Sequence, residues 1–168
     1  GKVHEVVDYL KGELKAAGFT DADMEVTDYD NKGEPTQGLM VWYRSENPEH
    51  EPIVLLAHMD VVDALAEDWV RDPFALTEEE RYFFGRGTAD NKYGVTNLVQ
   101  TFIRLKKEGW QPNRDIVMVL SGDEETGMVS TRGQAAYVDE NIKPAFILNA
   151  DSGGLALGPA GEPLYYGV

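Results

Sequence analysis

Hydrophobic residues recur along the chain with the spacing of amphipathic helices in three segments. In residues Val3 to Phe19 and Asn91 to Glu108, apolar side chains return every three or four positions, with charged residues between them. Gly18 and Gly109 stand where these two helices are expected to end. A third, shorter pattern predicts a helix over Ser130 to Asn141.

Short apolar runs bounded by Gly, Pro, Asn or Asp predict the strands. The predicted strands are Met24–Tyr29, Leu39–Tyr43, Ile53–Ala57, an edge-like strand in "RYFFGRG" that includes Phe83 and Phe84, Asp115–Ser121, Ala145–Ala150 and Pro163–Val168. The first two are expected to be joined by a turn, "DNKGEPTQG". Because strands and helices alternate in the second half, the pattern predicts an α/β fold with a mixed, mostly parallel sheet flanked by helices.

Composition narrows the possible partners and metal ligands. The 168 residues contain 30 acidic and 15 basic side chains, a formal charge of −15, which argues against nucleic acids and anionic membranes as partners. The absence of cysteine excludes disulfides and thiolate metal sites. No apolar run approaches the ~20 residues of a membrane span. No signal peptide is visible, which favours the cytoplasm, but the chain begins at Gly1 without an initiator Met, so an exported form stays open.

The segments that follow four predicted strands all carry acidic residues. They read "HMD", "GRGTADNK", "GDEETG" and "DSGG", and the first also carries a histidine. Ligands of parallel α/β sheets bind at the carboxyl ends of the strands. Carboxylates that converge there need cations beside them. The pattern therefore predicts a cation site at this edge of the sheet.

The first two of these segments supply a histidine and two aspartates with alternative interpretations. His58 and Asp60 are two residues apart, so in an extended segment both point to one face. Asp60 is placed to orient His58 or the surroundings of a metal, although an exposed pair at a strand end has the same pattern. Asp90 precedes the second helix and is either its N-cap or a ligand that bridges two metals.

The other two segments supply three further acids. Glu124 and Glu125 are adjacent after a buried strand, so either one binds a metal while the other moves protons, or both are solvated loop charges. Asp151 precedes Ser152 and two glycines and is either a turn former or a ligand.

A ligand count leaves one position of a two-metal site open. Histidine and carboxylate ligands suit zinc, and hydrolytic two-metal sites hold their ions ~3.5–4 Å apart. His58 and Asp151 complete the ligands of one ion if Asp90 bridges the two ions. Glu125 supplies one ligand to the other ion. The remaining histidines, on the first helix and in the loop "ENPEHEP", do not fill the last position well.

Four motifs in this order and spacing resemble the M20 family of co-catalytic zinc peptidases and amidohydrolases. They are "LLAHMDVV", "FGRGTADNK", "SGDEETG" and "NADSGG", and Trp69 with the "DPF" at 72–74 also fits the family. The resemblance runs from about Ile53 to Gly154. The family includes carboxypeptidases, dipeptidases, aminoacylases and succinyl-diaminopimelate desuccinylase, so it implies a small peptide or N-acyl amino acid substrate.

The resemblance also implies how the site residues divide the work. Four of them would hold two zinc ions, with cobalt or manganese also acceptable: His58, Asp90, Glu125 and Asp151. Asp90 would bridge the ions and Asp60 would steady His58. Glu124 would be the general base, taking a proton from the bridging water and passing it to the leaving amine.

Two departures from the family pattern shape the expectations for this chain. The last zinc ligand of the family is a histidine beyond an inserted lid or dimerisation domain. Residues 1–168 are therefore expected to be the amino-terminal part of a catalytic domain, incomplete at its C-terminus and inactive alone. The parent protein would dimerise through the domain absent here. Asn91 and Tyr93 also depart from the pattern after Asp90, without an expected effect on the metals.

Parts of the sequence point to two other classes of protein. A fragment that acts only as a metal-binding or structural module remains the alternative function. A calcium-binding loop at "DYDNKGE" fails, because Lys32 and Leu39 occupy positions that need oxygen ligands.

Overall fold

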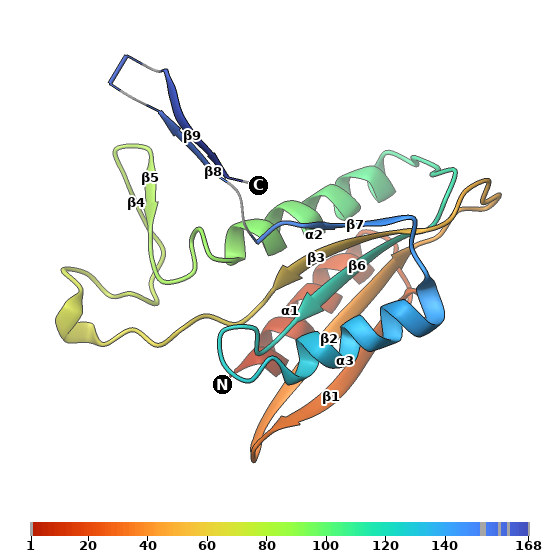
Figure 1. The fold of residues 1–168 in the computed structure, drawn as a ribbon, viewed down its shortest axis with the longest axis horizontal. Helices are drawn as coiled ribbons and strands as arrows, with labels where there is room; N and C mark the ends of the chain where they lie inside the picture. Colours follow the sequence, from red (N-terminus) through yellow and green to blue (C-terminus); the bar gives the residue numbers. More distant parts are fainter. Residues whose placement is uncertain (1, 152–153, 158, 161, 168) are drawn as a thin grey trace.

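The computed structural model describes residues 2–151, 154–157, 159–160 and 162–167, and in this part of the chain helices flank a mixed sheet on both faces (Figure 1). Five strands form the sheet in the order β1-β2-β6-β3-β7. Their bounds are Met24–Asn31 (β1), Glu34–Tyr43 (β2), Ile53–His58 (β3), Ile116–Ser121 (β6) and Phe146–Asn149 (β7). The expected α/β fold with a mixed sheet is confirmed.

The parallel half of the sheet contains the last three of these strands. β3 pairs in parallel with β6 on one side and with β7 on the other, whereas β1, β2 and β6 pair antiparallel. In the register, His58 lies opposite Ser121, and Leu56 lies opposite Asn149. The carboxyl ends of β3, β6 and β7 therefore lie side by side, as the sequence predicted.

The turn between β1 and β2 is shorter than expected. The predicted nine-residue turn is wrong: the strands continue to Asn31 and from Glu34, which face each other in the ladder. Lys32 and Gly33 alone form the turn, with φ of 55° and 93°. Two positive φ angles match the twist of a hairpin, and glycine adopts them without strain.

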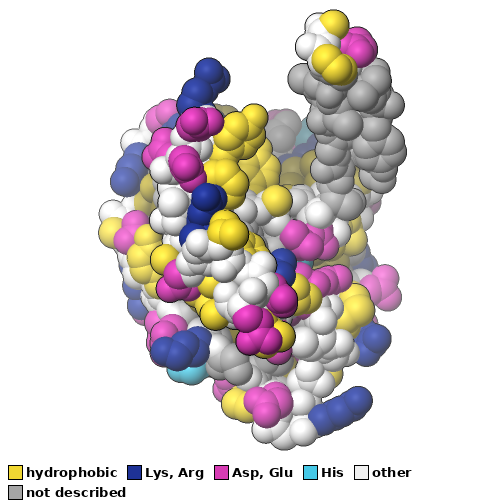
Figure 2. All heavy atoms as spheres, turned by 90° about the vertical axis from the view of Figure 1, so that its left-hand side faces the viewer, with side chains coloured by type: hydrophobic (Ala, Val, Ile, Leu, Met, Phe, Trp, Pro, Cys, Tyr) yellow, Lys and Arg dark blue, Asp and Glu magenta, His cyan; other side chains and the backbone are white. Residues whose placement is uncertain are grey.

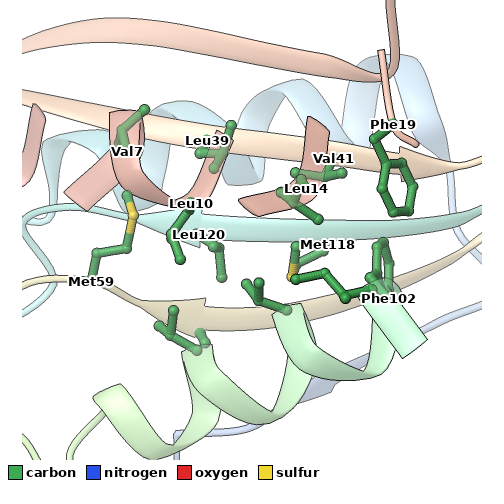
Figure 3. Packing of buried hydrophobic residues seen from close by; sticks show 14 of the residues in the cluster. Val7, Leu10, Leu14, Phe19, Leu39, Val41, Met59, Phe102, Met118 and Leu120 are labelled. Atoms are coloured by element: carbon green, nitrogen blue, oxygen red, sulfur yellow. The ribbon is translucent and has the colours of Figure 1, made fainter. Parts of the chain in front are cut away.

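One face of the sheet is covered by α1 (Val3–Ala16) and α2 (Lys92–Lys107). The buried side chains of both helices meet those of β2 and β6 in the main core (Figure 3). At one end of this core, the ring of Phe102 lies 6.0 Å from that of Phe19 and 5.7 Å from that of Tyr43. Among the described residues, no helix is both long and apolar enough to cross a membrane.

The opposite face is covered by α3 (Val129–Tyr137), which continues as a π-helical turn over Val138–Ile142. A smaller core under this helix joins Met40, Val54, Val117, Val119 and Val138. β7 is not covered in the same way: Phe146, Ile147 and Leu148 are 48%, 48% and 55% exposed. Parallel strands are normally buried on both faces, so this edge is unusual.

Two small hairpins lie outside the main sheet. The predicted edge strand in "RYFFGRG" is β5 (Tyr82–Phe84), but among the described residues it pairs with β4 (Thr77–Glu79) and not with the main sheet. The sequence suggested that the segment after this strand reaches the site from an edge of the main sheet. This expectation is wrong, because β5 does not belong to that sheet. The last predicted strand is β9 (Pro163–Gly167), paired with β8 (Gly154–Leu157). Ser152, Gly153 and Val168, which belonged to predicted features, lie outside the described residues.

Candidate metal centre

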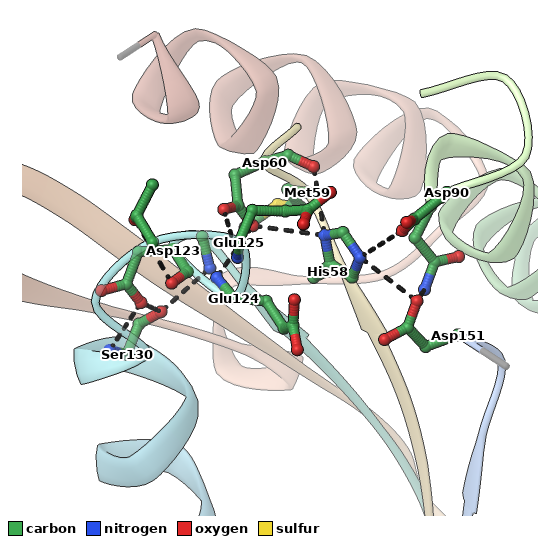
Figure 4. Close-up of polar contacts among 12 residues, drawn as sticks. His58, Met59, Asp60, Asp90, Asp123, Glu124, Glu125, Ser130 and Asp151 are labelled. Atoms are coloured by element: carbon green, nitrogen blue, oxygen red, sulfur yellow. Dashed lines mark hydrogen bonds and ion pairs between the residues drawn. The ribbon is translucent and has the colours of Figure 1, made fainter. Parts of the chain in front are cut away.

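The structure brings all six predicted site residues together at the carboxyl edge of the parallel strands (Figure 4). They come from four segments that are far apart in the sequence. His58 ends β3 and Asp60 follows it, Asp90 precedes α2, Glu124 and Glu125 follow β6, and Asp151 follows β7. The convergence predicted from the strand ends is thus present in the fold.

His58 is buried, with 2% of its surface exposed, and carboxylates flank both ring nitrogens. Nε2 lies 2.8 Å from Oδ1 of Asp90 and 3.2 Å from Oδ1 of Asp151. Nδ1 lies 3.1 Å from the backbone oxygen of Asp60 and 3.3 Å from its Oδ1. The ring therefore joins Asp60 on one side to Asp90 and Asp151 on the other.

Asp60 links the histidine to the two glutamates. Its Oδ1 accepts the backbone N–H of Glu124 and its Oδ2 that of Glu125, each at 3.0 Å. These bonds fix the loop after β6 against the segment after β3. Because its carboxylate oxygens are occupied in this way, Asp60 is suited to orient its neighbours.

Asp90 and Asp151 approach the ring from the other side. The alternative interpretation of Asp90 as the N-cap of α2 is wrong, because Asn91 is the N-cap and accepts the N–H of Gly94 at 3.0 Å. The side chain of Asp90 is instead 64% exposed and faces His58. Asp151 is mostly buried, with 23% of its side chain exposed.

Neighbouring charges shift the pKa values of three of these groups. Burial opposes the charged form of His58, but hydrogen bonds to Asp60 and Asp90 and the charge of Asp151 outweigh it and raise its pKa to about 9. Burial also disfavours the charged form of Asp60 and acts to raise its pKa. The hydrogen bonds from His58 and from the two backbone N–H groups outweigh this and lower the pKa of Asp60.

Glu124 is shifted in the opposite direction. Burial raises the pKa of its carboxyl group, and the charges of Asp151, Glu125 and Asp60 add to this, while His58 opposes it. A carboxylate with a raised pKa is a better proton acceptor, as a general base requires.

Three polar residues to which the sequence patterns assign no role organise this region. Asp123 is 3% exposed and its side chain accepts the backbone N–H groups of Val129 and Ser130, which caps α3. Asn91 donates to Asp151 at 3.1 Å, and Lys92 donates to the backbone oxygen of Met59. The "SGDEETG" motif contains Asp123, but only the fold separates its capping function from the positions of the two glutamates.

The donor set fits metal ions of the kind the sequence predicted. Ligand atoms of His58, Glu124 and Asp151 lie within 4.8 Å of one another, and so do those of His58, Asp90 and Glu125. Histidine with carboxylates is a ligand set of zinc. Neither His4 nor His50 belongs to either group in the described part of the chain.

A groove with a volume of about 590 Å³ begins at this centre. His58, Glu124 and Asp151 line it together with apolar residues such as Leu56, Val138 and Ile147. Figure 2 shows the side of the molecule that is at the left of Figure 1, where the strands β3 and β6 end; acidic and hydrophobic side chains are interspersed over it.

Fold and donor set together define an α/β protein with a candidate metal centre. Residues 54–161 match the family described as peptidase family M20/M25/M40, and the chain belongs to this family. The resemblance inferred from the four motifs is therefore confirmed.

Individual relatives agree with this membership. The chain is 35% identical over 115 residues to human N-fatty-acyl-amino acid synthase/hydrolase PM20D1, which covers 68% of this chain and 22% of that protein. It is 36% identical over 120 residues to a probable succinyl-diaminopimelate desuccinylase of Staphylococcus aureus, covering 68% and 27%. The chain thus spans about a quarter of the length of these relatives.

The fold is similar to solved structures as well. The di-peptidase Dug1p from Saccharomyces cerevisiae superposes with a TM-score of 0.76 at 20% identity, over 94% of this chain and 35% of that one. At this identity, the likeness shows a shared fold.

Proposed function

We propose that this chain forms the metal-holding part of a hydrolase that cleaves a peptide or N-acyl amino acid amide bond with water activated by two zinc ions. The observation that carries the proposal is the convergence of His58 with the carboxylates of four separate segments at one sheet edge. Membership of the M20/M25/M40 family supports the same chemistry.

In this proposal the ligands divide between the two ions as the resemblance implies. His58 and Asp151 would hold one ion, Glu125 would hold the other, and Asp90 would serve as a ligand of both. The contacts of His58 Nε2 with Asp90 and Asp151 agree with a shared ion in that place. Zinc is the proposed metal, although cobalt and manganese accept the same ligands.

The protein residues carry the proton transfer. When bound, the zinc pair would lower the pKa of a water to ~7 and polarise the carbonyl of the substrate. Glu124 removes a proton from the attacking water as its oxygen bonds to the carbonyl carbon. It then gives the proton to the leaving nitrogen as the C–N bond breaks. Asp60 keeps the backbone of Glu124 in place during both transfers.

The substrate is proposed to be a small peptide or an N-acyl amino acid. The names of the relatives support this class, since they describe an N-fatty-acyl-amino acid hydrolase, a desuccinylase and a di-peptidase. The charge of −15 speaks against nucleic acid or an anionic membrane as partner. Dimerisation of the parent protein through a domain outside this chain belongs to the same proposal.

The alternative function is a metal-binding or structural module without activity of its own. It is favoured for the isolated chain by the relatives' greater length. The ligand division that the resemblance implies also favours it, because that division gives one ion three ligands and the other only two. Residues 1–168 are then the amino-terminal part of the catalytic domain.

Metal content of the purified chain tests the proposal. After dialysis against zinc, elemental analysis is expected to find about one zinc per chain, because one ion has three protein ligands. The Asp151→Ala variant is expected to lose it, and substitution of His50, which lies outside both ligand groups, to retain it. Zinc bound equally by all three proteins would overturn the assignment of the site.

Activity separates the two candidate functions. The zinc-loaded chain is assayed with dipeptides and N-acyl amino acids beside its Glu124→Gln variant. Hydrolysis that this substitution abolishes would assign the enzyme function to the chain itself. Binding of zinc without hydrolysis would leave the chain as a metal-binding module of a longer enzyme.

A further inference from the structure

Three consecutive residues at the start of α2 contact two of the other strand-end segments, those that follow β3 and β7. Asp90 lies beside His58, as described above. The next residue, Asn91, donates its Nδ2 hydrogen to Oδ1 of Asp151 at 3.1 Å. The one after it, Lys92, donates from Nζ to the backbone oxygen of Met59. The helix start is thus connected to both β3 and β7.

Asn91 is fully buried, with 0% of its surface exposed, and both ends of its amide are used. Oδ1 accepts from the N–H of Gly94, and Nδ2 donates to Asp151. A Cβ atom at Gly94 would lie 2.9 Å from the backbone oxygen of Ala150, so glycine allows the helix to approach the residue before Asp151. Asn91 therefore caps α2 and holds a proposed ligand at once.

Lys92 acts on the segment between His58 and Asp60. Met59 is 1% exposed, and its N–H donates to the backbone oxygen of Ser121 at 2.7 Å. The bond from Lys92 occupies the carbonyl of the same residue. Burial lowers the pKa of Lys92, while the charge of Asp60 opposes this. Met59 is consequently fixed to β6 through its N–H and to α2 through its oxygen.

These contacts matter because the carboxylates of the site repel each other without a cation. Asp151 also follows a strand of only four residues whose apolar side chains are about half exposed. Residues that donate to metal ligands commonly change metal affinity 10–100-fold when they are replaced.

We propose that Asn91 and Lys92 are positioning residues, which hold Asp151 and the segment from His58 to Asp60 at the distances from Asp90 that a pair of metal ions needs. The inference rests on the proposed function, since it concerns the same metal centre. It assigns a task to two residues for which the family resemblance gave none.

The zinc affinity of designed variants tests this, measured by competition with a chelating dye. Asn91→Ser keeps an oxygen that caps Gly94 but is too short to reach Asp151. Lys92→Met keeps the apolar stem and loses the donor. Each is expected to weaken zinc binding about tenfold, in the range known for outer-shell partners. Lys92→Arg, which keeps charge and donor, is expected to recover part of the loss.

Matched controls exclude effects of charge and folding. Lys107→Met removes a charge from the exposed end of α2, and Tyr93→Phe changes the neighbouring residue, which is 65% exposed. Both are expected to bind zinc like the wild type. Metal-free Asn91→Ser is expected to unfold at a lower urea concentration than the wild type but to stay folded under the conditions of the zinc titration. The cobalt-substituted variant is expected to show an altered visible spectrum.

Each possible result has a defined meaning. Weaker zinc binding by variants that remain folded supports positioning. If wild-type protein binds zinc and Asn91→Ser and Lys92→Met bind it equally well, the positioning inference is overturned and the proposed function stands. If the zinc affinity of the variants falls only as far as their lower stability against urea explains, Asn91 and Lys92 stabilise the fold generally. The inference is then also overturned. Absence of zinc binding by the wild type would overturn the inference and the proposed metal centre together.

Discussion

The side chain of Asp60 and the backbone of Glu124 are joined by a hydrogen bond of 3.0 Å, across 64 residues of sequence. The second carboxylate oxygen accepts from Glu125 in the same way. The proposed general base and its neighbouring ligand are thus held by one residue, which also contacts His58. The positions of base and metal are coupled through Asp60.

This coupling predicts that Asp60→Asn weakens metal binding although Asp60 is not a proposed ligand. The amide has one acceptor oxygen in place of two, so one backbone N–H of the glutamate pair loses its partner. We expect zinc affinity to fall about 10–100-fold, as for other residues that support metal ligands. Chelator competition measures it, and an affinity equal to that of the wild type would show that the glutamate loop is held by other contacts.

Glu124→Gln is expected to separate chemistry from metal binding. Loss of a general base typically costs about 10²–10⁴-fold in rate. In a protein long enough to be active, we therefore expect turnover to fall by that factor while zinc content stays the same. Glu125→Gln should instead reduce the zinc content. Parallel elemental analysis and rate measurements check both, and loss of metal from the Glu124 variant would contradict the division of work.

The metal-free chain is expected to lose stability as pH rises from 6.5 to about 9. The pKa of His58 is raised from 6.5 to about 9 in the folded chain, so its protonated form stabilises the fold. This contribution is complete below pH 6.5 and disappears as pH passes through the folded pKa. Urea unfolding in the presence of EDTA measures the trend, and His58→Gln should flatten it.

Zinc binding is expected to show the opposite dependence on pH. The metal competes with the proton on His58, so apparent affinity should rise with pH up to about 9. Titration calorimetry in buffers of different ionisation enthalpy would reveal the released proton. Affinity that does not change with pH would indicate that His58 is not a ligand.

The main core gives a prediction about stability alone. Phe102 is 2% exposed and its ring packs against Phe19 and Tyr43. Phe102→Ala is expected to destabilise the fold by about 3–5 kcal/mol, the range for removal of a buried aromatic ring. Tyr9→Ala on α1, which is 65% exposed, serves as the control with little expected change. Urea denaturation of the metal-free proteins measures both.

The sequence could predict the site because its residues follow strands at fixed positions. His58, Glu124 and Asp151 lie at the ends of apolar strands or shortly after them, and the parallel order places those ends together. The predicted length of the hairpin turn was wrong because residues 34–37, which have a turn-like composition, belong to β2. Their pairing with β1 in a half-exposed part of the sheet outweighs that composition. Such local polarity cannot distinguish a turn from an edge strand.

The capping and positioning residues could not be predicted for a different reason. Asn91 contacts Asp151 across 60 positions, and Lys92 contacts Met59 across 33. Neither contact has a periodic pattern in the sequence, because it depends on how α2 lies against the ends of β3 and β7. Asp90 was a reasonable N-cap by residue type, but the helix begins one residue later than that interpretation needs.

The uncovered strand β7 has a consequence for the behaviour of the chain in solution. An open strand edge with exposed apolar faces invites pairing between molecules. A formal charge of −15 keeps like molecules apart at low ionic strength. Added salt shortens the range of that repulsion to about 10 Å at 0.1 M. The chain is therefore best kept in dilute buffer, and concentrated salt favours its self-association through β7.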